Sequence, residues 1–263
     1  MSVLNICGRA LARFLAKPRH THGIAPPTRS QRLLALLQPA DVLLVEGNSR
    51  VSAAIKYLTQ STWSHAALYV GCISDSPGRQ LENQFIEADT LDGVRSVGIA
   101  HYDNLHTRIC RPLGLTTEDR DKVVQYAISR LGHRYDLRNL VDLARYLLPT
   151  PPVPQRFRRR MIALGSGDPT RAICSTLIAQ AFQSVRYPIL PNVSSHSAER
   201  PDCPGCVEEI LRVRHFSLFV PRDFDVSPYF QILKPLLDEQ FNYRVLRWAD
   251  SDVEAARFLD GPR

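Results

Sequence analysis

One stretch of the chain, residues 171–182, constrains the fold more than any other, because it has the pattern of a half-buried helix that opens with a cysteine. The apolar side chains after Cys174 recur at helical spacing: Leu177, Ile178, Ala181, Phe182 and Val185. Cys174 would then lie in the first turn, where backbone N–H groups have no partners and the helix dipole favours negative charge. A thiol in that position can ionise near neutral pH and act as a nucleophile. The alternative is a buried structural cysteine that behaves as a small apolar residue.

The composition bounds the protein class without choosing a function. The 263 residues allow one large domain or two small ones, and an apolar content of 44% is enough for a core. No apolar run approaches the roughly 20 residues that span a bilayer. The net charge of +7 suits an anionic partner such as a membrane surface or a polyanion. The basic and aromatic interleaving typical of RNA-binding proteins is absent, so we expect no specific nucleic acid.

The cysteine spacing and the chain ends give the expected compartment and domain limits. The six cysteines show no disulfide framework, which favours a reducing compartment. We expect a cytoplasmic protein, with peripheral attachment to a membrane as the alternative. Residues 1–30 are read as a basic tail, residues 31–240 as one domain and residues 241–263 as a second tail. The arginines in the first segment interrupt the apolar core that a secretory signal needs.

Periodicity and turn signals predict a chain of mixed strands and helices. The predicted strands are residues 41–46, 61–71, 85–88, 93–97, 107–111 and 216–220. The predicted helices are residues 31–37, 51–57, 118–131, 135–147, 174–185 and 227–237. Residues 72–84 form a polar stretch with a turn signal at residues 77–78, and residues 187–206 are expected to be irregular or mobile.

Two further residues could work with the cysteine. A nucleophilic thiol needs a base within hydrogen-bond reach and a third group that orients the base. His65 lies in a predicted strand between Trp63 and Leu68, where burying an imidazole is costly unless it has a partner. Glu87 follows two apolar residues in another predicted strand and could supply the orienting carboxylate. The alternatives are a structural histidine with satisfied hydrogen bonds and a carboxylate on the solvent face.

Five segments in this order resemble one known family. They are residues 41–47 (DVLLVEG), 61–71 around His65, 85–88 (FIEA), 132–136 (GHRYD) and 173–178 around Cys174. They are similar to the permuted papain-like cysteine amidases, the YiiX/YebB-like branch of the NlpC superfamily, over about residues 31–190. The resemblance implies a circularly permuted papain-like α+β fold with an antiparallel sheet packed against helices. It also implies that the histidine strand precedes the cysteine helix, the reverse of papain.

The resemblance also implies roles for individual residues. Cys174 would be the nucleophile, His65 the general base and Glu87 the group that orients the imidazole. The segment between His65 and Glu87 is longer than the family needs, so Glu82 and Asp89 are the alternatives for the third position.

Three further positions would belong to the substrate site: Tyr135, Trp63 and Ser64. Tyr135 matches a tyrosine near the family's active site, and core packing is its alternative. Backbone N–H groups at the start of the cysteine helix, with a group near Ser64, would hold the oxyanion.

The implied activity is hydrolysis of an amide or acyl bond through a thioester, with no metal or cofactor. The alternatives are a lipid acyl hydrolase or acyltransferase of the same fold, and a papain-like binding module without turnover. Two sequence features lie outside this scheme. The basic cluster Arg156, Arg158, Arg159 and Arg160 could bind an anionic membrane surface, a polyanion or an acidic substrate, or could be a plain solvated face. Cys203 and Cys206 have half of a zinc-site spacing, which His196 or His215 would have to complete.

Overall fold

The computed structural model describes residues 30–76, 79–89, 92–133, 174–200, 203–234, 244 and 249–251. Their elements, in chain order, are α2 (Ser30–Leu36), β1 (Val42–Glu46), α3 (Arg50–Thr59), β2 (His65–Ser76), β3 (Arg79–Asp89), β4 (Gly93–Gly98), η1 (Ile99–Tyr102), β5 (His106–Pro112), α4 (Thr117–Ser129), α7 (Cys174–Ser184), β6 (Asn192–Arg200), β7 (Cys203–Arg212), η3 (Phe216–Leu218), α8 (Pro221–Asp225) and β8 (Phe230–Leu233). The predicted helix over residues 135–147 lies outside the described residues.

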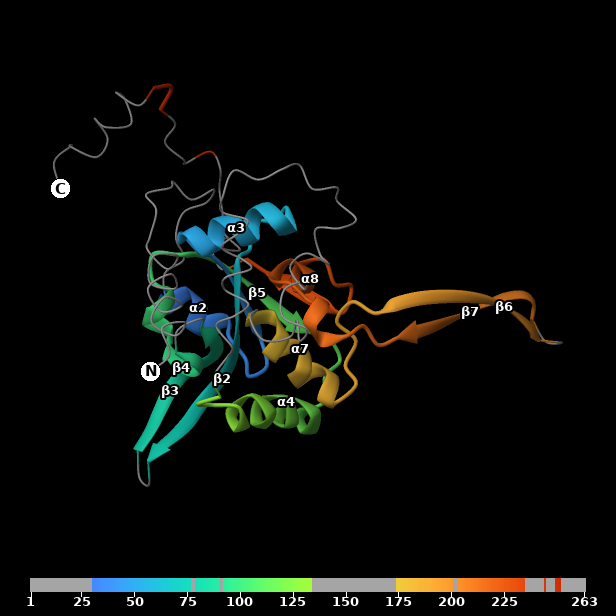
Figure 1. The fold of residues 1–263 in the computed structure, drawn as a ribbon, viewed down its shortest axis with the longest axis horizontal. Coiled ribbons are helices and arrows are strands. Elements are labelled where there is room, and N and C mark those ends of the chain that lie inside the picture. Colours follow the sequence, from blue (N-terminus) through green and yellow to red (C-terminus); the bar gives the residue numbers. More distant parts are fainter. Residues whose placement is uncertain are drawn as a thin grey trace, which may run out of the picture.

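The body of the protein is built on a six-stranded antiparallel sheet in the order β4-β3-β2-β1-β5-β8 (Figure 1). Strand β1 has neighbours on both sides, and all five of its residues are buried. A continuous apolar run such as Val42–Val45 is what a strand covered on both faces requires. The mixed α+β architecture with an antiparallel sheet therefore agrees with the prediction.

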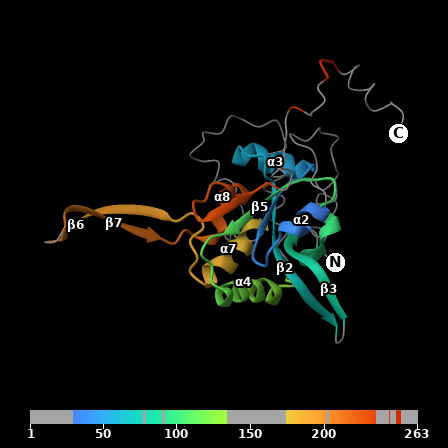
Figure 2. The same ribbon diagram turned by 180° about the vertical axis from the view of Figure 1, so that it is seen from behind.

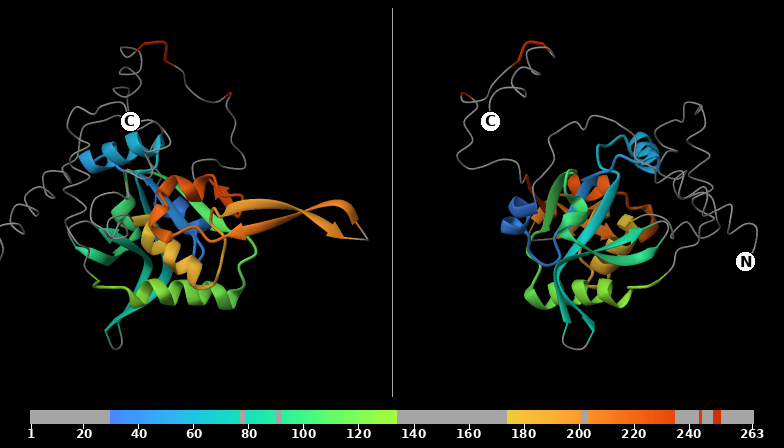
Figure 3. Two further views of the ribbon diagram at one scale, coloured as in Figure 1. Left: turned by 45° about the vertical axis from the view of Figure 1, so that its right-hand side comes forward. Right: turned by 90° about the vertical axis from the view of Figure 1, so that its left-hand side faces the viewer.

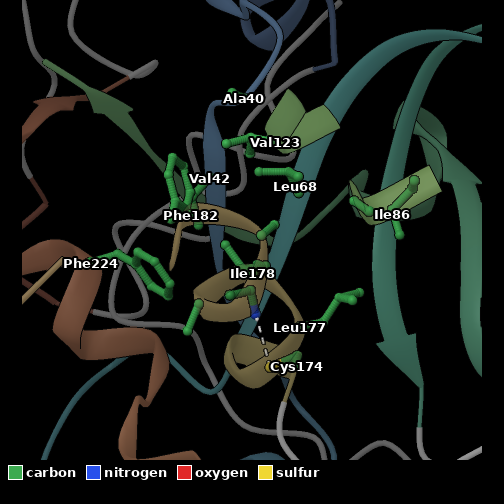
Figure 4. Close-up of a cluster of buried hydrophobic side chains, with 14 of the residues drawn as sticks. Ala40, Val42, Leu68, Ile86, Val123, Cys174, Leu177, Ile178, Phe182 and Phe224 are labelled. Carbon is green, nitrogen blue, oxygen red and sulfur yellow. Dashed lines mark hydrogen bonds between the residues drawn. The ribbon is translucent and has the colours of Figure 1, made fainter. Parts of the chain in front are cut away.

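Alternate residues of the sheet enter two separate cores because side chains point to opposite faces of a strand. Val42 and Leu44 of β1 pack with α4 and α7 on one face, as Figure 4 shows in close-up. Leu43 and Val45 pack on the other face, with Leu33 of α2. Figure 2 shows the sheet from behind, and Figure 3 shows α2 and α7 on opposite sides of it.

The helices begin where the sequence provides caps. Ser49 accepts a hydrogen bond from the backbone of the first turn of α3, and Thr116 does the same for α4. Helix α7 begins at Cys174, as predicted, and its side chains are buried from Cys174 to Ala179. This helix contacts β2, β3, α4 and η3, so it forms the centre of the first core.

A long β-hairpin projects from the body, where the sequence predicted an irregular stretch over residues 187–206. Strands β6 and β7 pair from Asn192↔Arg212 to Arg200↔Cys203 and form a sheet of their own (Figures 1 and 2). The prediction was wrong because these strands satisfy each other's backbone groups, and none of the described side chains of the hairpin, at residues 192–195 and 209–212, is buried. No hydrophobic period then marks them in the sequence.

Three other segments also differ from the prediction. Residues 72–84 are mostly strand: the polar stretch forms the distal part of the β2–β3 hairpin, and register shifts in β2–β3 obscure its alternation. The predicted strand over residues 216–220 is absent: residues 216–218 form η3, because His215 caps that turn through Ser217 N, and Pro221 opens α8. Residues 230–233 form β8 rather than helix, because pairing with β5 outweighs the helix-start signal at Ser227.

None of the helices in the described part of the chain combines the length and the apolar character that crossing a membrane requires.

Candidate functional site

Cys174 is the first residue of α7, and its sulfur faces the edge of strand β2. The backbone N–H of Ala66 donates a hydrogen bond to the Cys174 Sγ at 3.2 Å, drawn as a dashed line in Figure 4. Tyr69 N–H donates toward β1, to Asp41 O, and N–H directions alternate along a strand. The N–H of Ala66 therefore points toward β3, where the β2–β3 pairs have already ended at Leu68↔Ile86. The sulfur takes the place of the missing strand partner.

His65 opens strand β2 and bridges the thiol and a buried carboxylate. Its Nε2 lies 2.7 Å from Glu87 Oε2, so Nδ1 is the nitrogen left for Cys174. Burial works against the charged imidazole, but the charge of Cys174, a hydrogen bond to its sulfur and the contact with Glu87 together raise the pKa of His65 well above its ordinary value. The side chain is 27% exposed, so one edge of the ring reaches the surface.

The Glu87 carboxylate has a donor on every side and is only 2% exposed. Oε2 accepts from His65 and, at 2.8 Å, from the hydroxyl of Tyr102. Oε1 accepts from Nε and Nη2 of Arg95 at 3.0 and 2.8 Å. Burial alone would favour the protonated acid, but His65, Tyr102 and Arg95 together hold the pKa of Glu87 far below its usual range.

Chain topology explains how His65 and Glu87 meet across 22 residues. The β2–β3 hairpin contains the intervening residues and returns the chain to the start of β2. Of the two alternatives for the third position, Asp89 contacts Arg95 at 3.5 Å and Glu82 is exposed. The structure therefore brings Cys174, His65 and Glu87 together, while their roles in catalysis stay predictions.

Sequence reasoning missed Arg95, Tyr102 and the N–H of Ala66. Arg95 had a signal, because it lies directly opposite Glu87 in the β3–β4 pairing and opposite charges often face each other across strands. Tyr102 had none: the edge-to-face contact of its ring with Phe85, with centroids 5.0 Å apart, places the hydroxyl on the carboxylate. A backbone N–H is the same at every residue, so the sequence cannot single one out.

Two residues expected at the substrate site, Ser64 and Trp63, are buried and make hydrogen bonds within the fold. Ser64 is buried, and its hydroxyl accepts a hydrogen bond from Gly47 N at 2.9 Å. Trp63 is buried too, and its indole N–H donates to Asp225 at 3.1 Å. The polar atoms of both side chains are thus used within the fold, and their expected contact with a substrate stays a prediction. Tyr135 lies outside the described residues.

A second histidine–carboxylate pair lies at the same end of the sheet, without a thiol. Glu46 ends β1 and contacts His106 Nδ1 at 3.2 Å and Lys56 Nζ at 3.3 Å. The His106 ring packs on Trp63, with centroids 5.0 Å apart. Both carboxylate oxygens of Glu46 thus have a partner within the fold, and the residues form a structural cluster.

The other cysteines in the described part of the chain differ from Cys174. Cys72 is exposed, whereas Cys110 is buried and burial raises its thiol pKa well above the ordinary value. Cys203 and Cys206 lie on β7, and their side chains lie outside the described residues. Among the side chains that the structure describes, no group of three or more His, Cys, Asp or Glu is placed to hold a metal. The basic cluster over residues 156–160 also lies outside the described residues.

Comparisons with known proteins add little to this geometry. No protein-family model matches the chain, and no curated protein matches it. Among solved structures, the chain is similar to the metalloprotein yiiX from Escherichia coli O157:H7, at 16% identity and a TM-score of 0.44 over 74% of this chain and 96% of that one. A superposition of this quality establishes neither a shared family nor a shared activity. The permuted papain-like fold and the NlpC superfamily therefore stay predictions.

Proposed function

We propose that this protein is a cysteine hydrolase that cleaves an amide or acyl bond through a thioester on Cys174. The observation that carries the proposal is the contact of His65 Nε2 with Glu87 at 2.7 Å, which leaves Nδ1 for the sulfur that Ala66 N–H also contacts. Nucleophile, base and orienting acid are the parts that covalent acyl transfer requires. The free state of the described cysteines suits a reducing compartment, for which we propose the cytoplasm.

In the proposed mechanism, His65 holds the proton of Cys174 and the thiolate attacks the carbonyl carbon of the substrate. The carbonyl π electrons move to oxygen, and N–H groups at the start of α7 stabilise that oxyanion, a contribution of roughly 3–4 kcal/mol per donor. Collapse of the intermediate expels the amine or alcohol, which takes the proton from His65. Water then gives a proton to His65, attacks the thioester and releases the acid, and the thiol is restored.

Glu87 contributes electrostatically rather than by taking the proton. Its pKa is held far below the usual range, so the carboxylate stays ionised throughout the cycle. A fixed negative charge beside Nε2 keeps the ring oriented and favours the imidazolium that the first step creates.

Thiol labelling tests the first step without a known substrate. Cys174 is only 5% exposed, whereas Cys72 is exposed, so a faster reaction at Cys174 has to come from its ionised state. We expect iodoacetamide at pH 6 to label Cys174 faster than Cys72, and His65→Ala to remove the difference. Labelling of Cys174 at or below the rate of Cys72 contradicts the proposal, and Cys174→Ala identifies the labelled site.

A substrate panel separates the reaction classes. Wild type, Cys174→Ala and His65→Ala are compared on an amino-acid anilide, an activated ester and phospholipid vesicles. Amide or ester turnover that both variants lose supports the hydrolase. Turnover of phospholipid alone identifies the lipid acyl hydrolase instead, and a reactive thiol without turnover on any of the three identifies a binding module.

A further inference from the structure

The carboxylate that orients His65 is itself held in place from two other elements. Strand β4 contributes Arg95 and the short helix η1 contributes Tyr102, while His65 comes from β2. Each carboxylate oxygen has its own pair of contacts: Oε1 with Nε and Nη2 of Arg95, and Oε2 with His65 and Tyr102. Rotation of the Glu87 side chain would break all four contacts at once, so its direction toward the imidazole is fixed.

Arg95 is anchored in turn, which turns a flexible side chain into a rigid support. Its Nη1 contacts Asp92 at 2.7 Å and its Nη2 lies 3.5 Å from Asp89. The guanidinium thus contacts these two acids as well as Glu87. Arginine supplies several donors in a fixed planar geometry, which a lysine ammonium cannot reproduce.

Tyr102 adds a donor that keeps its proton at physiological pH. Burial, together with the charge of Glu87, raises the pKa of Tyr102 well above its ordinary value, so the hydroxyl keeps its proton. The hydroxyl therefore donates to Glu87 Oε2 at neutral pH.

We infer that Arg95 and Tyr102 are positioning residues that act on Cys174 only through Glu87 and His65. They keep the carboxylate ionised and aimed at Nε2. The inference rests on the proposed function, because it concerns the activation of the same thiol. In the part of the chain that the structure describes, His101 of η1 also faces the carboxylate, at 3.6 Å from Oε1 and with its side chain 45% exposed.

The first test follows the labelling rate of Cys174 by iodoacetamide between pH 4 and pH 8. We expect Arg95→Met to lower the rate at pH 6 about tenfold, because hydrogen bonds to a charged group are lost. We also expect the acidic limb of the profile to move to higher pH, because Glu87 without Arg95 takes up a proton more readily. Arg95→Lys should recover part of the rate, and Tyr102→Phe should cause a smaller loss of the same kind.

The exposed histidine gives the matched control. His101 faces the same carboxylate oxygen as Arg95, but at 3.6 Å it lies beyond hydrogen-bond distance. His101→Gln should leave both the rate and the position of the acidic limb unchanged. An equal effect of His101→Gln and Arg95→Met would show that general surface charge is responsible, and would overturn the inference.

A double substitution distinguishes action through Glu87 from a separate structural role. Arg95→Met alone leaves a buried carboxylate short of a partner and can lower stability by itself. The pair Glu87→Gln with Arg95→Met removes both charges and avoids this. If Arg95 acts only through Glu87, the double variant labels at the rate of Glu87→Gln alone. If the labelling rate of the double variant instead falls by the product of the two single losses, Arg95 acts independently of Glu87 and the inference is overturned.

The labelling rate of Cys174 in the wild type distinguishes a failure of the proposed function from a failure of the inference about Arg95 and Tyr102. A wild-type Cys174 that labels no faster than Cys72 refutes the proposed function itself. A fast wild-type Cys174 with an equally fast Arg95→Met variant leaves the proposed function intact and refutes the inference alone.

Discussion

Replacement of Glu87 by glutamine tests whether the carboxylate stabilises the fold as well as orienting His65. Glutamine keeps the shape of the side chain but replaces one acceptor oxygen with an NH2 donor. That NH2 group would face either Arg95 or the pair His65 and Tyr102, and all of these groups are donors themselves. Loss of one partner of a buried ion pair costs about 3–5 kcal/mol. Arg95 and His65 are 30% and 27% exposed, so water compensates part of the loss. We expect the free energy of unfolding to fall by about 2–4 kcal/mol.

The assay is urea and thermal unfolding at pH 7, followed by circular dichroism. A loss of this size lowers Tm by roughly 5–15 °C for a chain of this length. Glu82→Gln is the matched control, because Glu82 lies on the same strand but is exposed. That substitution should stay within about 0.5 kcal/mol of the wild type.

The pH dependence provides the sharper refutation. The pKa of Glu87 lies below its ordinary value of 4.5, so its contribution is fully present above that pH and is lost as the pH falls toward the folded-state pKa. The difference between wild type and Glu87→Gln should therefore be constant between about pH 4.5 and pH 6.5 and shrink below about pH 4.5. A difference under about 0.5 kcal/mol at pH 7, or one that grows on acidification, would refute the reasoning.

Two further predictions concern the backbone at the end of β1 and the imidazole. Gly47→Ala would place a Cβ 2.3 and 2.9 Å from two serine hydroxyl oxygens, so we expect urea unfolding to show a loss of about 1–3 kcal/mol; Gly98→Ala, whose nearest neighbour would lie at 3.6 Å, should cost less. The charged imidazole of His65 stabilises the fold fully below about pH 6.5, and this contribution is lost as the pH rises through its raised pKa. In an NMR titration Cys174→Ala should lower that pKa and Cys72→Ala should not; equal shifts would contradict the assignment of its cause.

Secondary structure was predictable where burial leaves a period in the sequence. Helix α7 shows this clearly, because one continuous core covers it and its apolar residues mark the buried face. The β6–β7 hairpin shows the opposite case: its strands pair with each other and none of their described side chains is buried, so the sequence shows no period that separates them from a polar loop. Strand β8 was missed for a third reason, since its pairing with β5 depends on a partner far away in the chain.

The residues of the candidate site also differ in how far the sequence could predict them. Cys174 and His65 could be selected because a cysteine at a helix start and a histidine in an apolar strand are both unusual positions. Glu87 could be proposed but not distinguished from Glu82 and Asp89, because the register shifts of the β2–β3 hairpin obscure its length in the sequence. Tyr102 depends on ring packing, which only the assembled fold defines.

Strand β2 through helix η1, residues 65–102, has a consequence for how such a site changes over time. This single uninterrupted segment supplies the imidazole, the carboxylate and both of the groups that support it. The sulfur arrives from a separate helix and is held to that segment by packing and one backbone contact. Replacement of the one residue at position 174 therefore leaves His65 and Glu87, the groups that handle the proton, in place. The scaffold is free to acquire a different nucleophile, or to keep a charged pocket for binding alone, without rebuilding its sheet.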